Sequence, residues 1–270
     1  MQVKDAAMSP EHLAYLRSLR RKRRNIAAAR VLLLVALLLL WEVGANLGWV
    51  NPFITSQPSG IVRTIANLYR DGELFRHIGV TVYETVVGFT LGTLLGTAIA
   101  VVLWWWEGLA KVLEPYLVVL NSLPKISLGP IIIVWIGSGS AAIIVMALLV
   151  SVVVTILGVY SGFGQVHPDR IKLLRSFGAS KGQILLKAIL PGSIPTVVSA
   201  LKINVGLSWV GVIVGEFLVS KAGLGYLAVY GGQVFRLNLV MTSVIILAIA
   251  AALMYQAVVF LEKLFTRWQQ

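Results

Sequence analysis

Residues 172–180 read Lys-Leu-Leu-Arg-Ser-Phe-Gly-Ala-Ser, and Leu190-Pro191 follow farther along the chain. This basic, polar stretch lies between two long apolar runs. Its helix-boundary residues are spaced as in two short helices joined by a tight turn. We therefore take the segment 164–195 as an organised loop that docks another protein.

The turn residues of this segment predict its local structure. Asp169 is placed to cap a first helix that runs to about residue 177. Gly178 permits a left-handed turn, which a Cβ would disfavour. Ser180 is placed to cap a second helix over 181–190, and Pro191 is expected to help end it. Two stiff short helices are expected.

Composition places the chain in a membrane. Of its 270 residues, 58% are hydrophobic and 13% are charged, whereas soluble domains carry about 25% charged residues. The net charge of +12 is read as a membrane-topology signal, so no nucleic-acid partner is expected. The sequence has no cysteine, which excludes disulfides and thiolate metal sites.

Six apolar runs are long enough to cross a bilayer, which needs about 20 residues. We read the first run, after the basic cluster 20–24, as a retained span and not as a signal peptide. Most of the 23 Lys and Arg residues then fall in segments that place both termini and 164–195 in the cytoplasm. The fold class is all-α, a polytopic membrane protein with six transmembrane helices, at about 30–48, 78–104, 112–136, 140–163, 196–219 and 238–262.

The N-terminal residues 1–29 are read as a cytoplasmic tail that precedes a six-span domain, 30–270. Ser9 and Pro10 have the form of a helix start. Leu13, Leu16 and Leu19 give an apolar stripe, so we expect an amphipathic helix on the inner membrane surface. A disordered basic tail is the alternative.

Glycines recur every fourth residue along the second expected span. Gly88, Gly92 and Gly96 lie on one helix face, and the lack of a Cβ lets a second helix approach closely. This face is predicted to pack against another span, whose identity the sequence does not reveal.

The landmarks Gly178 and Leu190-Pro191 resemble the cytoplasmic coupling loop of binding-protein-dependent ATP-binding-cassette (ABC) importer permeases of type I. In that family an acidic-Ala-Ala triplet precedes the glycine, whereas this chain has Lys172-Leu173-Leu174 there, and Ala188 replaces the usual Ile. The resemblance implies that the segment contacts an ATPase, with the contact residues Arg175, Ser176, Phe177, Gly178, Ala179, Ser180, Leu190 and Pro191.

Further segments resemble the nitrate/sulfonate/bicarbonate (taurine-like) branch of the same family, in order along nearly the whole chain from about residue 30. They are Trp41-Glu42, Asn51-Pro52-Phe53, residues 123–130, Gly215-Glu216-Phe217 and Gly223-Leu224-Gly225. The resemblance implies a transport subunit in a bacterial inner membrane that works as a homodimer. Its implied partners are a cytoplasmic ATPase dimer, which holds the ATP and magnesium, and an extracytoplasmic substrate-binding protein.

Polar residues within the spans are candidates for the transport pathway. Lys125 lies between Pro124 and Pro130, where we expect a broken helix. It is expected either to meet an anionic substrate or to pair with a carboxylate or reach the membrane surface. Glu216 is expected to line the outer gate, to receive the binding protein, or to pair with Lys221 or Arg236. The full candidate set is Asn121, Ser122, Lys125, Ser127, Asn204, Ser208 and Glu216.

No catalytic or metal-binding set is recognisable, because the three histidines are far apart and no phosphate-binding loop occurs. We therefore expect a transport subunit for a small solute such as a sulfonate, nitrate or related anion, and not an enzyme. An ion-gradient-driven transporter, or an importer of a thiamine-precursor pyrimidine or aromatic compound, remains the alternative.

Overall fold

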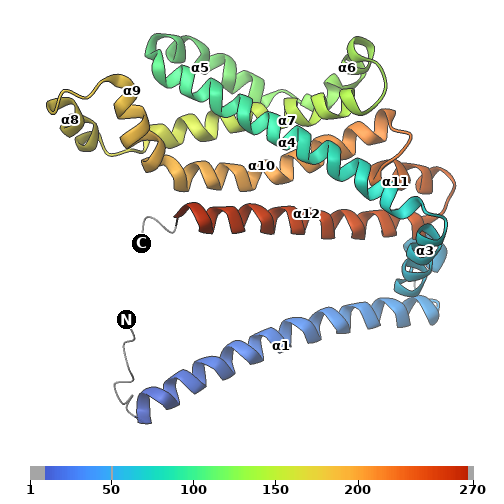
Figure 1. Ribbon diagram of the computed structural model, residues 1–270. Helices are drawn as coiled ribbons and strands as arrows, with labels where there is room; N and C mark the ends of the chain where they lie inside the picture. The colour runs from blue at the N-terminus through green and yellow to red at the C-terminus, as the bar shows by residue number, and fades with distance from the viewer. Residues whose placement is uncertain (1–9, 50, 267–270) are drawn as a thin grey trace. The chain divides into compact units, whose positions relative to one another are not determined.

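The computed structural model describes residues 10–49 and 51–266, and every regular element among them is a helix (Figure 1). These residues form two compact units that divide between Arg63 and Thr64. The elements are α1 Pro10–Asn46, α2 Pro52–Thr55, α3 Pro58–Arg70, α4 Glu73–Trp105, α5 Glu107–Ser122, the 3₁₀ helix η1 Lys125–Leu128, α6 Gly129–Ile136, α7 Ser140–Gly164, α8 Pro168–Ser176, α9 Lys181–Ile184, the π-helix η2 Leu185–Ile189, α10 Leu190–Val219, α11 Leu224–Gln233 and α12 Leu237–Thr266.

The N-terminal unit is dominated by α1, whose leucine-rich half is exposed. The expected boundary at 29/30 falls inside this helix, so the basic segment and the first apolar run form one continuous helix. Pro10 is its first residue, and Ser9 lies outside the described residues. Near the end of α1, the Glu42 carboxylate accepts a hydrogen bond from the Ser59 backbone N–H at 3.0 Å. This bond ties the end of α1 to the start of α3.

In the second unit, α7 packs between α4 and α10 through small residues. A Cβ on Gly88 of α4 would lie 2.8 Å from the Cβ of Ala147, and one on Gly211 of α10 would lie 2.6 Å from the Ala147 Cα. Gly92 and Gly96 face Ser151 and Thr155 of α7 in the same way. The glycine face predicted from the sequence is therefore a packing face, and its partner is α7.

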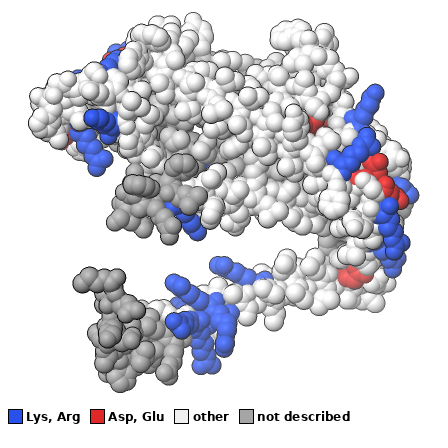
Figure 2. Space-filling view, viewed as in Figure 1, with Lys and Arg blue, Asp and Glu red and all other residues white. Residues whose placement is uncertain are grey.

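A second apolar core joins α10, α11 and α12, which lie side by side in Figure 1. Its buried members include Trp209 of α10, Leu227 of α11 and Leu247 of α12. On the face seen in Figure 2, the middle of this unit is almost free of charged side chains, which gather at its two ends. That distribution suits a body whose middle lies in hydrocarbon.

Five helical runs among the described residues are long and apolar enough to cross a membrane. The third expected span, 112–136, is not one helix: α5 and the η1–α6 pair meet at 86°. The break itself was predicted at Pro124, and Leu123 before it has the extended backbone that a following proline favours. The count of six spans therefore holds only if this bent pair crosses as one.

Candidate functional site

The segment 164–195 begins with α8, whose cap differs from the prediction. His167, and not Asp169, is the N-cap, because its Nδ1 accepts the Asp169 backbone N–H at 3.4 Å. Asp169 lies one turn from Lys172, and their charged groups are 3.6 Å apart on the exposed surface. Asp169 still places a negative charge in the first turn of α8, where the helix dipole favours it.

The turn after α8 forms at Gly178 as predicted, with φ +78°. The Gly178 N–H donates to the Arg175 carbonyl at 2.9 Å, and the Ala179 N–H donates to the Leu174 carbonyl at 3.0 Å. This pair of bonds is the Schellman arrangement that ends a helix with a left-handed residue. A Cβ on Gly178 would have open space around it. The left-handed backbone conformation, and not close packing, is therefore the reason that glycine is favoured here.

Ser180 caps the second helix as predicted. Its hydroxyl accepts the Gln183 N–H at 3.4 Å, and the Gln183 side chain accepts the Ser180 N–H at 2.8 Å, which completes a capping box. We call residues 175–180 the tip of the segment. Every backbone turn that builds the tip is closed by hydrogen bonds within 173–184.

The prediction that Pro191 ends the second helix is wrong. Helical backbone continues from Lys181 through the π-turn Leu185–Ile189 into α10 and on to Val219. Pro191 follows the π-turn Leu185–Ile189 closely, and the changed hydrogen-bond register of that turn accommodates a residue that has no backbone N–H. The fifth expected span is therefore continuous with the second helix of the segment.

The tip is exposed, whereas the residues that follow it are buried. Phe177 in the tip is 79% exposed, and Leu173, which precedes the tip in α8, is 57% exposed. In contrast, Ile184, Leu185 and Ile189 pack in one apolar cluster with residues of α4 and α7, among them Ala100, Val159 and Phe163. We call Ile184, Leu185 and Ile189 the base of the segment. An exposed apolar tip thus stands on a base that is fixed to two long helices.

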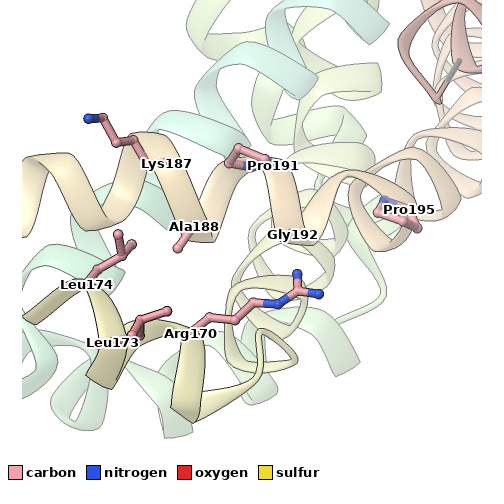
Figure 3. A pocket seen from close by; sticks show the side chains of 8 residues that line it. All are labelled: Arg170, Leu173, Leu174, Lys187, Ala188, Pro191, Gly192 and Pro195. Atoms are coloured by element: carbon pink, nitrogen blue, oxygen red, sulfur yellow. The ribbon is translucent and has the colours of Figure 1, made fainter. Parts of the chain in front are cut away.

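A cavity of about 610 Å³ lies between α8 and the helix that carries η2 and the start of α10 (Figure 3). Arg170 and Lys187 supply its positive charge, and Leu190 is not among its lining residues. The lining set is Arg170, Leu173, Leu174, Lys187, Ala188, Pro191, Gly192 and Pro195. Of the predicted contact residues, the structure brings Arg175–Ser180 together at the tip and leaves Leu190 and Pro191 nearer the base.

Four candidate pathway residues lie together at the bend between α5 and α6. Asn121, Ser122 and Ser127 are exposed, and Lys125 is partly buried. The Lys125 Nζ donates to the Asn121 carbonyl at 3.0 Å, and no ion pair joins it to a carboxylate within the described part of the chain. The bend therefore presents a cation and three polar side chains at one place.

Asn204 and Ser208 are fully buried in α10, so the expectation that they face a pathway does not fit the fold of the single chain. The Asn204 amide donates to the Thr155 hydroxyl at 2.7 Å and lies 3.4 Å from the Thr93 hydroxyl. These bonds join α10 to α7 and α4. Asn204 thus acts in helix packing, a role that polar groups serve well in hydrocarbon.

Glu216 is also buried, and the predicted pairing with Lys221 or Arg236 is wrong. Its carboxylate instead accepts the backbone N–H groups of Gly225 at 2.6 Å and Tyr226 at 3.3 Å, and no ion pair to either cation occurs in the ranges 10–49 and 51–266. Gly223 and Gly225 both press on this carboxylate, and neither has room for a Cβ. The Glu216 carboxylate therefore stabilises the start of α11.

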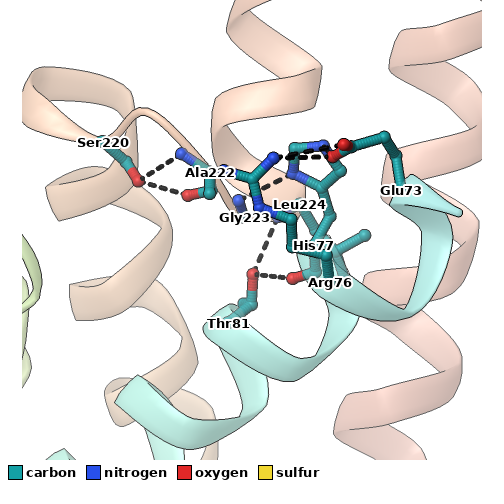
Figure 4. Close-up of polar contacts among 8 residues, drawn as sticks. All are labelled: Glu73, Arg76, His77, Thr81, Ser220, Ala222, Gly223 and Leu224. Carbon is teal, nitrogen blue, oxygen red and sulfur yellow. Dashed lines mark hydrogen bonds and ion pairs between the residues drawn. The ribbon is translucent and has the colours of Figure 1, made fainter.

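Two residues that the sequence did not single out also accept hydrogen bonds from the backbone at the start of α11 (Figure 4). His77 Nδ1 accepts the Gly223 N–H at 2.9 Å, and the Thr81 hydroxyl oxygen accepts the Leu224 N–H at 2.7 Å. Both residues belong to α4. The only available signal was the Gly223-Leu224-Gly225 run, which indicates a close backbone approach but not its partners.

Comparisons with known proteins match this architecture. Residues 81–269 match the family model described as binding-protein-dependent transport system inner membrane component. The chain is similar to the aliphatic sulfonates transport permease SsuC of Bacillus subtilis (27% identity, 92% of this chain and 90% of that protein). It is 30% identical to an ABC transporter permease protein of Haemophilus influenzae (83% and 91% covered).

Solved structures show the same fold. In the inward-facing MetNI methionine ABC transporter, one chain superposes with a TM-score of 0.64 at 22% identity, covering 73% of this chain and 98% of that one. The family match includes the whole of 164–195.

Proposed function

Because the chain belongs to the family of binding-protein-dependent transport system inner membrane components, we propose that its tip, residues 175–180, is where a cytoplasmic ATPase drives the membrane helices. The chain is the transmembrane subunit of an ABC importer, a multi-pass inner-membrane protein and not an enzyme. It works with an ATPase and a substrate-binding protein on other polypeptides, so ATP and magnesium are bound by the partner ATPase.

The observation that carries the proposal is the contrast between the tip and the base. The tip offers Phe177 at 79% exposure beside the cation Arg175, on a backbone that its own caps hold rigid. The base buries Ile184, Leu185 and Ile189 against α4 and α7. A displacement of the tip by an ATPase must therefore move the long helices, since a close-packed cluster transmits displacement.

The acidic-Ala-Ala triplet of the family does not contribute to this contact. Lys172-Leu173-Leu174 stand in its place, and the Lys172 ammonium lies 3.6 Å from the Asp169 carboxylate within α8. We propose that the ATPase is recognised by the glycine turn and its flanking residues Arg175, Ser176, Phe177, Ala179 and Ser180, with Leu190 and Pro191 supporting the base.

We propose a homodimer, since one permease sequence supplies half of a two-fold pathway. On α5 and α6 many large apolar side chains are exposed, among them Val112 at 62% and Trp135 at 79%, and a second copy or lipid must cover them. Both termini and 164–195 are proposed to be cytoplasmic, with residues 1–29 as a cytoplasmic tail, because most Lys and Arg residues then lie inside.

The proposed substrate is a small anion of the sulfonate class. A relative named for aliphatic sulfonates covers 92% of this chain, and the bend at Lys125 places a cation beside Asn121, Ser122 and Ser127. A thiamine-precursor pyrimidine or an aromatic compound is the alternative class. The ligand of the substrate-binding protein distinguishes the two.

The deciding experiment changes the glycine turn. In the assembled complex in proteoliposomes, Gly178→Asp is expected to abolish ATP-dependent uptake while the complex still assembles, because φ +78° disfavours a side chain. Gly108→Asp is the matched control: it adds the same charge to an exposed glycine with open space and an ordinary backbone. Uptake by Gly178→Asp at the wild-type rate would contradict the proposal.

A further inference from the structure

Lys181, at the start of α9, reaches across to the end of α4. Its Nζ donates a hydrogen bond to the Trp105 carbonyl at 2.6 Å. The same Nζ lies 5.7 Å from the ring centroid of Trp104 and 5.7 Å from that of Trp105. Gly182, the next residue, approaches the Trp105 ring so closely that a Cβ would lie 3.9 Å from it. One side chain thus joins segments 76 positions apart in the sequence.

The Trp105 carbonyl lies at the end of its helix, where it requires a hydrogen-bond donor from elsewhere in the chain. Trp105 is the last residue of α4, and the chain turns at Trp106 (φ −117°, ψ 87°) before α5 begins. The final carbonyls of a helix have no intrahelical donor and carry its negative dipole end. A lysine ammonium supplies both a donor and a positive charge there, and two indole faces add cation–π attraction.

The helix that carries Lys181 does not account for its position. Lys181 is the first residue of α9, where the positive dipole end of a helix favours acidic side chains and not a cation. Ser180 and Gln183 already cap this helix without it. The contact with α4 is therefore the feature that explains a lysine here.

We propose that Lys181 is a positioning residue that fastens the tip to the turn between α4 and α5, so that movement of the tip is passed to α5. This inference rests on the proposed coupling function of 164–195. The apolar base packs against Ala100 of α4 and against Val159 and Phe163 of α7. This cluster includes no residue of α5. Lys181 reaches the turn from which α5 departs toward the bend at Lys125.

The experiment compares three variants of the assembled complex in proteoliposomes, with ATP hydrolysed per solute imported as the readout. Lys181→Met keeps the side-chain length and removes the charge, and it is expected to raise this ratio about tenfold or more, the order of one charge-assisted hydrogen bond. Lys181→Arg keeps a cationic donor and is expected to stay near the wild-type ratio. Lys111→Met, which removes an exposed cation from α5, is the matched control.

A chemical rescue separates coupling from mere folding. The chain has no cysteine, so in a complex with cysteine-free partners Lys181→Cys can be aminoethylated selectively. Restoring the ammonium is expected to restore the ratio. The inference is overturned if Lys181→Met matches Lys111→Met, or if aminoethylation leaves the ratio unchanged. If Gly178→Asp transports normally, the coupling function itself fails; if only the Lys181 variants behave as wild type, this inference alone fails.

Discussion

The contact between α4 and α7 predicts that two glycine-to-alanine substitutions on α4 change the free energy of unfolding in opposite directions. In Gly96→Ala, the added Cβ would lie 2.6 Å from the Cβ of Thr155 and 3.1 Å from the Val152 carbonyl oxygen. Carbon atoms in good contact are ~3.5–4 Å apart. The two helices must therefore separate by several tenths of an ångström or more along this face.

The magnitude follows from two opposing contributions. Overpacking a tight interface costs about 1–3 kcal/mol of the free energy of unfolding, and alanine in place of glycine returns up to ~1 kcal/mol in helix propensity. Gly96→Ala is therefore expected to destabilise the protein by about 1–2 kcal/mol. Gly79→Ala, on the same helix, meets no atom within 4 Å and is expected to stabilise it by up to ~1 kcal/mol.

The assay is reversible unfolding in mixed detergent micelles, followed by tryptophan fluorescence, with both variants measured against the wild type. The two variants carry the same chemical change, so propensity cancels in their difference and the packing contribution remains. If Gly96→Ala is as stable as Gly79→Ala, then α4 and α7 are not in contact at this face, and the packing of the second unit is wrong.

Three further outcomes follow. Glu216→Ala leaves the buried N–H groups of Gly225 and Tyr226 without their acceptor and is expected to cost about 1–3 kcal/mol in the same unfolding assay; a loss no larger than that of the exposed Glu107→Ala would contradict this. Asn204→Leu removes the bond to Thr155 and is expected to cost about 1 kcal/mol, whereas Ser199→Ala, an exposed change on the same helix, should be near neutral. Lys125→Ala is expected to lower the apparent affinity for an anionic substrate about tenfold, the order of one charge-assisted bond, while Lys125→Arg keeps it; transport unchanged in Lys125→Ala would remove this residue from the pathway.

Local backbone chemistry made the tip predictable. A glycine that follows a helix, and a serine three residues before Gln183, report on their immediate neighbours, and both Gly178 and Ser180 adopt the expected conformations. The break before Pro124 was predictable for the same reason, since a proline restricts the residue before it. The packing role of Gly88, Gly92 and Gly96 followed from their spacing.

Features that depend on distant partners were not predictable. Pro191 was expected to end a helix, but the π-turn before it lets the helix continue, and the sequence carries no sign of that turn. Glu216 was expected to pair with a charged side chain, Lys221 or Arg236, whereas its actual partners are backbone N–H groups of α11, which no residue type in the sequence marks. The angle of 86° at the bend likewise depends on how α5 and α6 pack, which one sequence does not specify.

The self-contained hydrogen bonding of the tip has a consequence for assembly. Because the turn at Gly178 and the cap at Ser180 are complete without any other chain, the tip has already lost its conformational entropy before it meets a motor subunit. Association then orders few new residues, so affinity is not reduced by a folding cost. The heat-capacity change on association should accordingly match the apolar area covered at the interface, with no added contribution from coupled folding.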